Sequence, residues 1–182
     1  MLINTPICDF GWQAPSFSLP DPSGQLFSSA DLMGENGMVV AFICNHCPYV
    51  KAIITRLVAD ADTLKDAGVS LVAIMSNDYQ RYPMDSPEKM SEFSRQHHMT
   101  FPYLIDETQQ VARAFGAVCT PDFFGLNADG QLHYRGRLDD GGMAGEGRSQ
   151  AELVDGMMQM MTTGTGPEHQ IPSMGCSVKW RG

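Results

Sequence analysis

Two cysteines stand three residues apart in the segment Cys44-Asn45-His46-Cys47, directly after the apolar run 38–43. An apolar run of this length is typical of a buried strand, and the helical spacing of apolar residues after the motif predicts a helix from about residue 48. A cysteine at such a junction can be activated as a thiolate and still be exposed to a partner. The motif therefore predicts a redox centre.

The expected chemistry is a dithiol and disulfide cycle. If Cys44 lies at the helix N-terminus, unpaired backbone N–H groups and the helix dipole lower its pKa by about one to several units. Cys47 lies within disulfide reach on the same face, so Cys44 should attack a partner and Cys47 should resolve the mixed disulfide. A zinc site would require a second cysteine pair, but Cys8, Cys119 and Cys176 are solitary, so no metal is predicted.

The segments that must position the dithiol alternate between strands and helices. We expect strands at 38–43, 69–75, 101–105, 122–126 and 131–138, helices at 48–67, 86–97, 106–115 and 149–161, and a hairpin at 17–27. Asp106 with Gln109, and Ser149 with Glu152, should form capping boxes. This order predicts an α/β fold in which helices flank a mixed central sheet.

The dithiol motif, the segments 101–106 and 120–122 and the turn 127–130 together resemble the thioredoxin fold, and in particular its redoxin branch of AhpC/TSA and thioredoxin-like proteins. The resemblance covers residues 15–162, and we expect one such domain over residues 1–163. It implies a thioredoxin-like fold with an N-terminal β-hairpin extension. Residues 164–182 should form an irregular C-terminal tail.

The resemblance also implies an activity, that of a thiol-disulfide oxidoreductase without an organic cofactor. Its partners would be protein disulfides, small thiols or disulfides, and a reductase. His46 precedes the second cysteine as in protein disulfide isomerases, where it would stabilise the thiolate of Cys44. Thr120 and Pro121 match the loop that carries a cis-proline facing the dithiol, so with Asn45 they are predicted to contact the substrate, the Thr120 backbone pairing with an extended chain.

Two departures from the related families affect the expected mechanism. Thioredoxins proper carry a buried aspartate where this sequence has Met38, so proton transfer must use another group, water or His46. Peroxiredoxins carry a threonine three residues before the peroxidatic cysteine, whereas Cys44 precedes Cys47 and Ala41 precedes Cys44 at that spacing. A thiol peroxidase, with antioxidant activity, is therefore the alternative function rather than the first.

Two further cysteines are candidate auxiliary thiols. Cys119 adjoins the predicted cis-proline loop, although a solitary buried cysteine is more often a small core residue. Cys176 belongs to a tail with too few apolar residues to form a core, which predicts a mobile segment. A mobile Cys176 could resolve a disulfide of Cys44 or Cys119, or it could be an exposed thiol without a function.

A copper carrier is a second alternative, in which Cys44, Cys47 and a distal histidine would be the ligands. Copper-delivery proteins on this fold usually separate their cysteines by three residues rather than two. The sequence departs from them at that position.

The composition limits which partners and which cellular compartment we expect. A net charge of -9 provides no basic surface for nucleic acid or an anionic membrane. No apolar run is long enough to span a bilayer, and residues 1–20 lack the pattern of a signal peptide. Five cysteines without a secretory signal predict a reducing cytoplasm. The glycine-rich acidic loop 139–148 lacks the ending of a phosphate-binding loop, so nucleotide binding is not expected.

Overall fold

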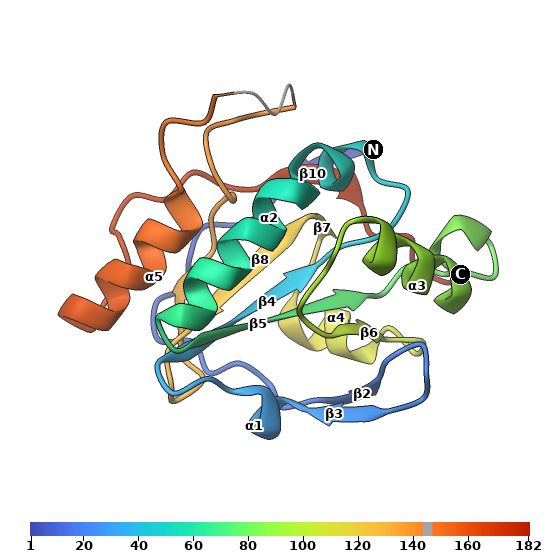
Figure 1. The fold of residues 1–182 in the computed structure, drawn as a ribbon, viewed down its shortest axis with the longest axis horizontal. Helices are drawn as coiled ribbons and strands as arrows, with labels where there is room; N and C mark the ends of the chain where they lie inside the picture. The colour runs from blue at the N-terminus through green and yellow to red at the C-terminus, as the bar shows by residue number, and fades with distance from the viewer. Residues whose placement is uncertain (144–146) are drawn as a thin grey trace.

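A five-stranded mixed sheet forms the centre of the computed structural model, which describes residues 1–143 and 147–182 (Figure 1). Residues 144–146 of the glycine-rich loop lie outside the described residues. The strands, in their order across the sheet, are β6 (Tyr103–Ile105), β5 (Val69–Met75), β4 (Gly37–Phe42), β8 (Asp122–Leu126) and β9 (Leu132–Tyr134). β4 is parallel to β5 and antiparallel to β8. The predicted α/β class with a mixed sheet is therefore confirmed.

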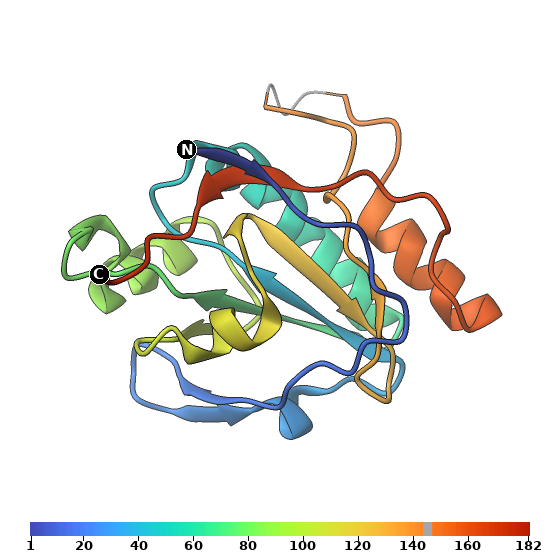
Figure 2. The ribbon, with the colours of Figure 1, turned by 180° about the vertical axis from the view of Figure 1, so that it is seen from behind.

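Helices cover both faces of this sheet. One face packs against α2 (Pro48–Asp66), α3 (Pro87–Gln96) and α5 (Glu152–Thr163), and Figure 1 is viewed from this side. The opposite face packs against α4 (Gln110–Phe115) and the predicted hairpin, formed by β2 (Ser18–Pro20) and β3 (Leu26–Ser28) and followed by α1 (Ser29–Leu32) (Figure 2). Successive side chains of β4 point to opposite faces of the sheet, and both faces are covered. Every residue of β4 is therefore buried, which explains its continuous apolar sequence.

The C-terminal segment contains a strand, β10 (Met174–Ser177), where an irregular tail was expected. β10 lies between β1 (Leu2–Asn4) and β7 (Cys119–Thr120) and is antiparallel to both (Figure 2). The strand forms because its backbone groups find hydrogen-bond partners in β1 and β7, segments distant in sequence that a local pattern does not reveal. The segment is thus held against the cis-proline loop rather than free.

The capping box expected at Asp106 is absent from α4, which begins at Gln110. The Asp106 carboxylate does accept the backbone N–H groups of Val111 and Ala112, at 3.3 and 2.8 Å. The side chain of Gln109 donates instead to the carbonyls of residues 76 and 179, at 2.7 and 2.9 Å. Partners distant in sequence therefore replace the local cap.

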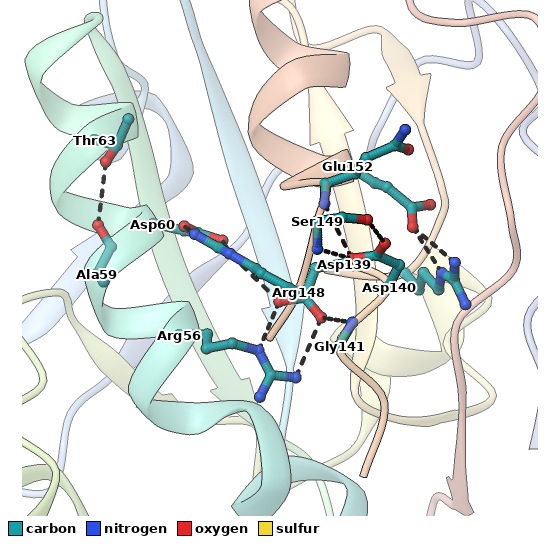
Figure 3. A network of polar contacts seen from close by, with 12 residues as sticks. Arg56, Ala59, Asp60, Thr63, Asp139, Asp140, Gly141, Arg148, Ser149 and Glu152 are labelled. Atoms are coloured by element: carbon teal, nitrogen blue, oxygen red, sulfur yellow. Dashed lines mark hydrogen bonds and ion pairs between the residues drawn. The ribbon is translucent and has the colours of Figure 1, made fainter. Parts of the chain in front are cut away.

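The second expected capping box, at α5, is also wrong, because Ala151 occupies the N-cap position. The Ser149 hydroxyl binds the carboxylate of Asp140, and Glu152 forms an ion pair with Arg137 at 2.8 Å (Figure 3). Ser149 and Glu152 therefore bind residues that precede the helix instead of capping its first turn.

A network of ion pairs ties the described ends of the glycine-rich loop to α2 (Figure 3). Arg148 makes two hydrogen bonds to Asp60, at 2.6 and 2.7 Å, and a third to Asp139 at 3.3 Å. Arg56 of α2 binds Asp139 at 2.7 Å. No helix among the described residues is long and apolar enough to cross a membrane.

Candidate redox site

The two cysteines of the motif lie where β4 passes into α2. Cys47 is the N-cap residue of α2, and Pro48 occupies the first turn, where its missing N–H costs no hydrogen bond. Cys44 precedes this turn in the connecting loop. The exposed fraction is 1% for Cys44 and 0% for Cys47, so neither side chain is open to solvent in this conformation.

Thr120 contacts both cysteines. The Thr120-Pro121 peptide bond is cis, as the resemblance implies. The Thr120 hydroxyl lies 3.4 Å from the Cys44 sulfur, and the Cys47 thiol donates to the Thr120 carbonyl at 3.1 Å. The structure thus brings together the dithiol and the predicted cis-proline loop, which come from distant parts of the sequence.

The surroundings favour a thiolate at Cys47 rather than at Cys44. The pKa of Cys47 is lowered chiefly by its interaction with Cys44, with smaller contributions from the Thr120 side chain and from the backbone of Cys176 and Val50, against its burial. The pKa of Cys44 is raised because its proton is shared with Cys47 and because it is buried. The expectation from sequence was the reverse. The free N–H groups of a helix lie in its first turn, and α2 begins after Cys47, not after Cys44.

His46 forms an ion pair with a buried carboxylate, that of Asp85 in the short helix η1 (Pro83–Asp85). The Nδ1 of His46 lies 2.6 Å from Asp85 Oδ2, although its N–H is not aligned well enough for a hydrogen bond. The contact with Asp85 raises the pKa of His46 despite the partial burial of the ring. His46 therefore retains its positive charge to a higher pH than a free histidine does.

Asp85 is a site residue that sequence analysis did not identify. It accepts the backbone N–H of Asn45 at 2.8 Å and the side-chain amide of Asn77 at 2.9 Å. Met38 stands where thioredoxins carry a buried acid, and Asp85 supplies a buried carboxylate from a different segment. No motif or spacing marked it, because residues 77–85 have the composition of an ordinary polar turn.

Asn45 holds the loop in place through its side chain, whereas it was expected to contact the substrate. Its amide nitrogen donates to the Met84 carbonyl at 3.0 Å, and its oxygen accepts the Tyr103 hydroxyl at 2.8 Å. Neither Met84 nor Tyr103 was expected from the sequence to contact Asn45. Burial raises the pKa of Tyr103, so its hydroxyl remains a neutral donor.

The backbone of Thr120, expected to pair with an extended substrate, already pairs with β10. Cys176 stands opposite Thr120 in that register. The strand approaches so closely that a Cβ atom on Gly175 would lie 1.9 Å from the Thr120 carbonyl oxygen. Cys176 is therefore brought to the dithiol on an ordered strand instead of a mobile tail.

Cys119, the other candidate auxiliary thiol, is fully buried. Its thiol donates to the Pro121 carbonyl at 3.5 Å, and burial raises its pKa. These surroundings are those of a small core residue rather than of a reactive thiol.

Three groups at this site could hold a metal ion. A Cys44 sulfur, a His46 ring nitrogen and an Asp85 carboxylate oxygen lie within 4.8 Å of one another. Thiolate and imidazole suit soft or borderline metals. The histidine in this group comes from the motif itself, whereas the copper-carrier alternative relied on a distant one.

A cavity of about 400 Å³ lies beside the cis-proline. Its walls are mainly apolar and include Tyr49 and Ile53 of α2, Pro121, Phe123 and Met174. The site therefore adjoins a space that suits an apolar group more than a charged one.

The family model for AhpC/TSA proteins matches residues 10–135, a range that includes the dithiol, the cis-proline and all five strands of the central sheet. The chain belongs to the AhpC/TSA family. Peroxiredoxin Bcp of Escherichia coli (strain K12) is similar to this chain, with 32% identity over 117 residues, which are 64% of this chain and 70% of that protein.

Other relatives extend the comparison. The thiol-disulfide oxidoreductase ResA of Bacillus subtilis (strain 168) is 25% identical over 122 residues, covering 67% of this chain and 64% of that protein. The crystal structure of an uncharacterized conserved protein from Geobacillus kaustophilus is 39% identical, with a TM-score of 0.89 over 100% of this chain and 97% of that one. This AhpC/TSA protein is therefore a thioredoxin-like oxidoreductase, and its alignment with the Geobacillus structure extends over the C-terminal segment as well.

Proposed function

We propose that the protein is a thiol-disulfide oxidoreductase of a reducing cytoplasm, which cycles Cys44 and Cys47 between dithiol and disulfide with protein or small-thiol partners. The observation that carries this proposal is the placement of both sulfurs against the residue before the cis-proline: the Cys44 sulfur lies 3.4 Å from the Thr120 hydroxyl, and the Cys47 thiol donates to the Thr120 carbonyl at 3.1 Å. Two thiols held at one residue at the start of α2 can act as a nucleophile and its resolving thiol.

In the reductive direction, the Cys47 thiolate attacks one sulfur of a partner disulfide. A mixed disulfide forms, and the partner's other sulfur leaves as a thiolate. Cys44 then attacks the Cys47 sulfur, breaks the mixed disulfide and passes its proton to the departing thiolate. The pair gives up two electrons and ends as the Cys44–Cys47 disulfide, while the partner gains both. This order assigns the first attack to Cys47, in agreement with the environment of the two sulfurs.

His46 is proposed to tune this couple. A positive charge near the dithiol stabilises the thiolate, and stabilising the reduced form makes the disulfide a stronger oxidant. The ion pair with Asp85 raises the pKa of His46 and so maintains that charge to a higher pH than in a free histidine.

A thiol peroxidase is the second candidate, supported by the favoured thiolate at Cys47 and by the likeness to peroxiredoxin Bcp. Cys47 would attack one peroxide oxygen, break the O–O bond and become a sulfenic acid, releasing water or an alcohol. Attack by Cys44 would then release water and form the same disulfide. The apolar cavity beside Pro121 would suit an organic hydroperoxide.

The test compares turnover of a small disulfide, insulin disulfides and an organic hydroperoxide, each supplied with a thiol reductant. Cys47→Ser should lose all activity, and Cys44→Ser should accumulate mixed disulfides. Cys8→Ser, which removes a half-buried thiol outside the site, is the matched control and should behave as wild type. Unchanged turnover in both site variants would exclude the proposal. Saturable peroxide consumption without disulfide reduction would favour the peroxidase.

A further inference from the structure

We propose that Cys176 is a third redox thiol, which exchanges with Cys44 at the Cys47 sulfur and so gives partners access to the buried pair through a Cys47–Cys176 disulfide. The inference rests on the proposed function, because it requires that the dithiol cycles.

The first support is the placement of β10. Cys176 stands opposite Thr120 in the antiparallel pairing of β10 with β7, and Thr120 contacts the sulfurs of both Cys44 and Cys47. Gly175 allows this close approach, since a Cβ atom there would clash with the Thr120 carbonyl. β10 thus occupies the position expected for an extended substrate, and it carries a cysteine there.

The second support is the packing of Cys176 against the dithiol. Cys176 packs against the buried cluster that contains Cys44 and Cys47, and the Cys47 thiol donates to the carbonyl of Thr120, the residue opposite Cys176. Two thiols that share one neighbouring residue need only a limited movement to form a disulfide. Burial and Cys47 raise the pKa of Cys176, and Lys179 and the N-terminal ammonium group offset part of that rise.

The third support is the difference in exposure among the three thiols. Cys44 and Cys47 are 1% and 0% exposed, whereas Cys176 is only partly buried. A partner as large as a protein can therefore reach the sulfur of Cys176 with less rearrangement than either sulfur of the motif.

The exchange balances without an external oxidant. Starting from the Cys44–Cys47 disulfide, the Cys176 thiolate attacks the Cys47 sulfur, so the Cys47–Cys176 bond forms and the Cys44–Cys47 bond breaks. Cys44 leaves with the electron pair and takes the proton that Cys176 released. A thiolate of a reducing partner then attacks Cys176, and Cys47 leaves as the thiolate that its surroundings favour. A second partner thiol releases Cys176 and completes the two-electron reduction.

The test uses the full chain with the replacement Cys8→Ser, so that three thiols of the site and Cys119 remain. Residues 1–51 contain Cys44 and Cys47 but no Lys or Arg before Lys51, and residues 149–179 form the tryptic peptide with Cys176. A Cys47–Cys176 disulfide therefore links these two peptides, whereas Cys44–Cys47 closes a loop within one. Mass spectrometry after mild oxidation with diamide and alkylation distinguishes the two.

In the Cys8→Ser/Cys44→Ser variant we expect linked peptides, and adding Cys176→Ser should abolish the link. Free thiols at both positions, or only intermolecular disulfides, would overturn the inference. The Cys8→Ser protein reports on the proposed function: if it forms no Cys44–Cys47 disulfide, that function fails, and if it forms one without a link in the variant, only this inference fails.

A kinetic measurement tests the access role. Cys176→Ser and Cys176→Ala should each slow the reduction of the Cys44–Cys47 disulfide by a protein dithiol about tenfold or more, because the attacked sulfur is then buried. Reduction at the wild-type rate in both variants would contradict the access role of Cys176. Cys8→Ser is the control and should leave the rate unchanged.

Discussion

The imidazole of His46 and the carboxylate of Asp85 form an ion pair with 2.6 Å between Nδ1 and Oδ2. Asp85 is completely buried, and the side chain of His46 is 28% exposed. The pair connects the motif to η1 and keeps a positive charge beside two thiols. Several expected outcomes depend on this arrangement.

Replacing His46 by Ala should lower the reduction potential of the Cys44–Cys47 couple. Loss of the cation destabilises the Cys47 thiolate, and each unit of increase in thiolate pKa corresponds to about 30 mV. Equilibration with a glutathione redox buffer measures the change. His169→Ala is the control, since His169 is an exposed histidine. An unchanged or higher potential for His46→Ala would contradict the tuning role.

The ion pair should also make stability depend on pH. Because the pKa of His46 is raised in the folded protein, its contribution is complete below the ordinary histidine pKa of about 6.5 and is lost as pH rises through the raised value. The disulfide form of wild type should therefore exceed His46→Gln in stability by up to about 1 kcal/mol at acidic pH, and by less at alkaline pH. Urea unfolding at pH 5.5 and 8.5 measures the difference, and a gap that widens with pH would disprove the assignment.

Thiolate absorbance at 240 nm should show which cysteine ionises first. The low-pH step should disappear in Cys47→Ser and survive in Cys44→Ala. In Cys44→Ala the step should move to higher pH, because Cys47 has lost the hydrogen bond from the Cys44 thiol that contributes most to its lowered pKa. Survival of the low-pH step in Cys47→Ser would show that Cys44, and not Cys47, forms the thiolate.

Removing Arg148 should destabilise the protein although it lies outside the redox site. Arg148→Ala leaves the buried carboxylate of Asp60 without its two hydrogen bonds, which we expect to cost about 1–3 kcal/mol given the partial exposure of the arginine. Chemical denaturation provides the measurement. Lys89→Ala, which breaks an exposed pair with Glu92, should change stability by less than about 0.5 kcal/mol. Equal effects would show that the network in Figure 3 adds nothing beyond a surface ion pair.

The sequence alone determined the fold class and the centre of the chemistry. The apolar run before Cys44 and the helical spacing after Cys47 are local patterns, and they correctly predicted β4 and α2. The cis bond before Pro121 followed from the family resemblance. Periodicity and motif spacing act over a few residues, so they can be recognised without knowledge of long-range contacts.

The tertiary structure decided the features that depend on distant partners. Asp85 reaches the site from a polar turn and forms an ion pair with His46, which is distant in sequence. β10 places Cys176 opposite Thr120 because its backbone pairs with β7, also distant in sequence. The choice of Cys47 over Cys44 as the favoured thiolate depends on where α2 begins and on which N–H groups face each sulfur. A sequence pattern locates a dithiol, but the pKa of each sulfur is set by the groups that folding brings around it.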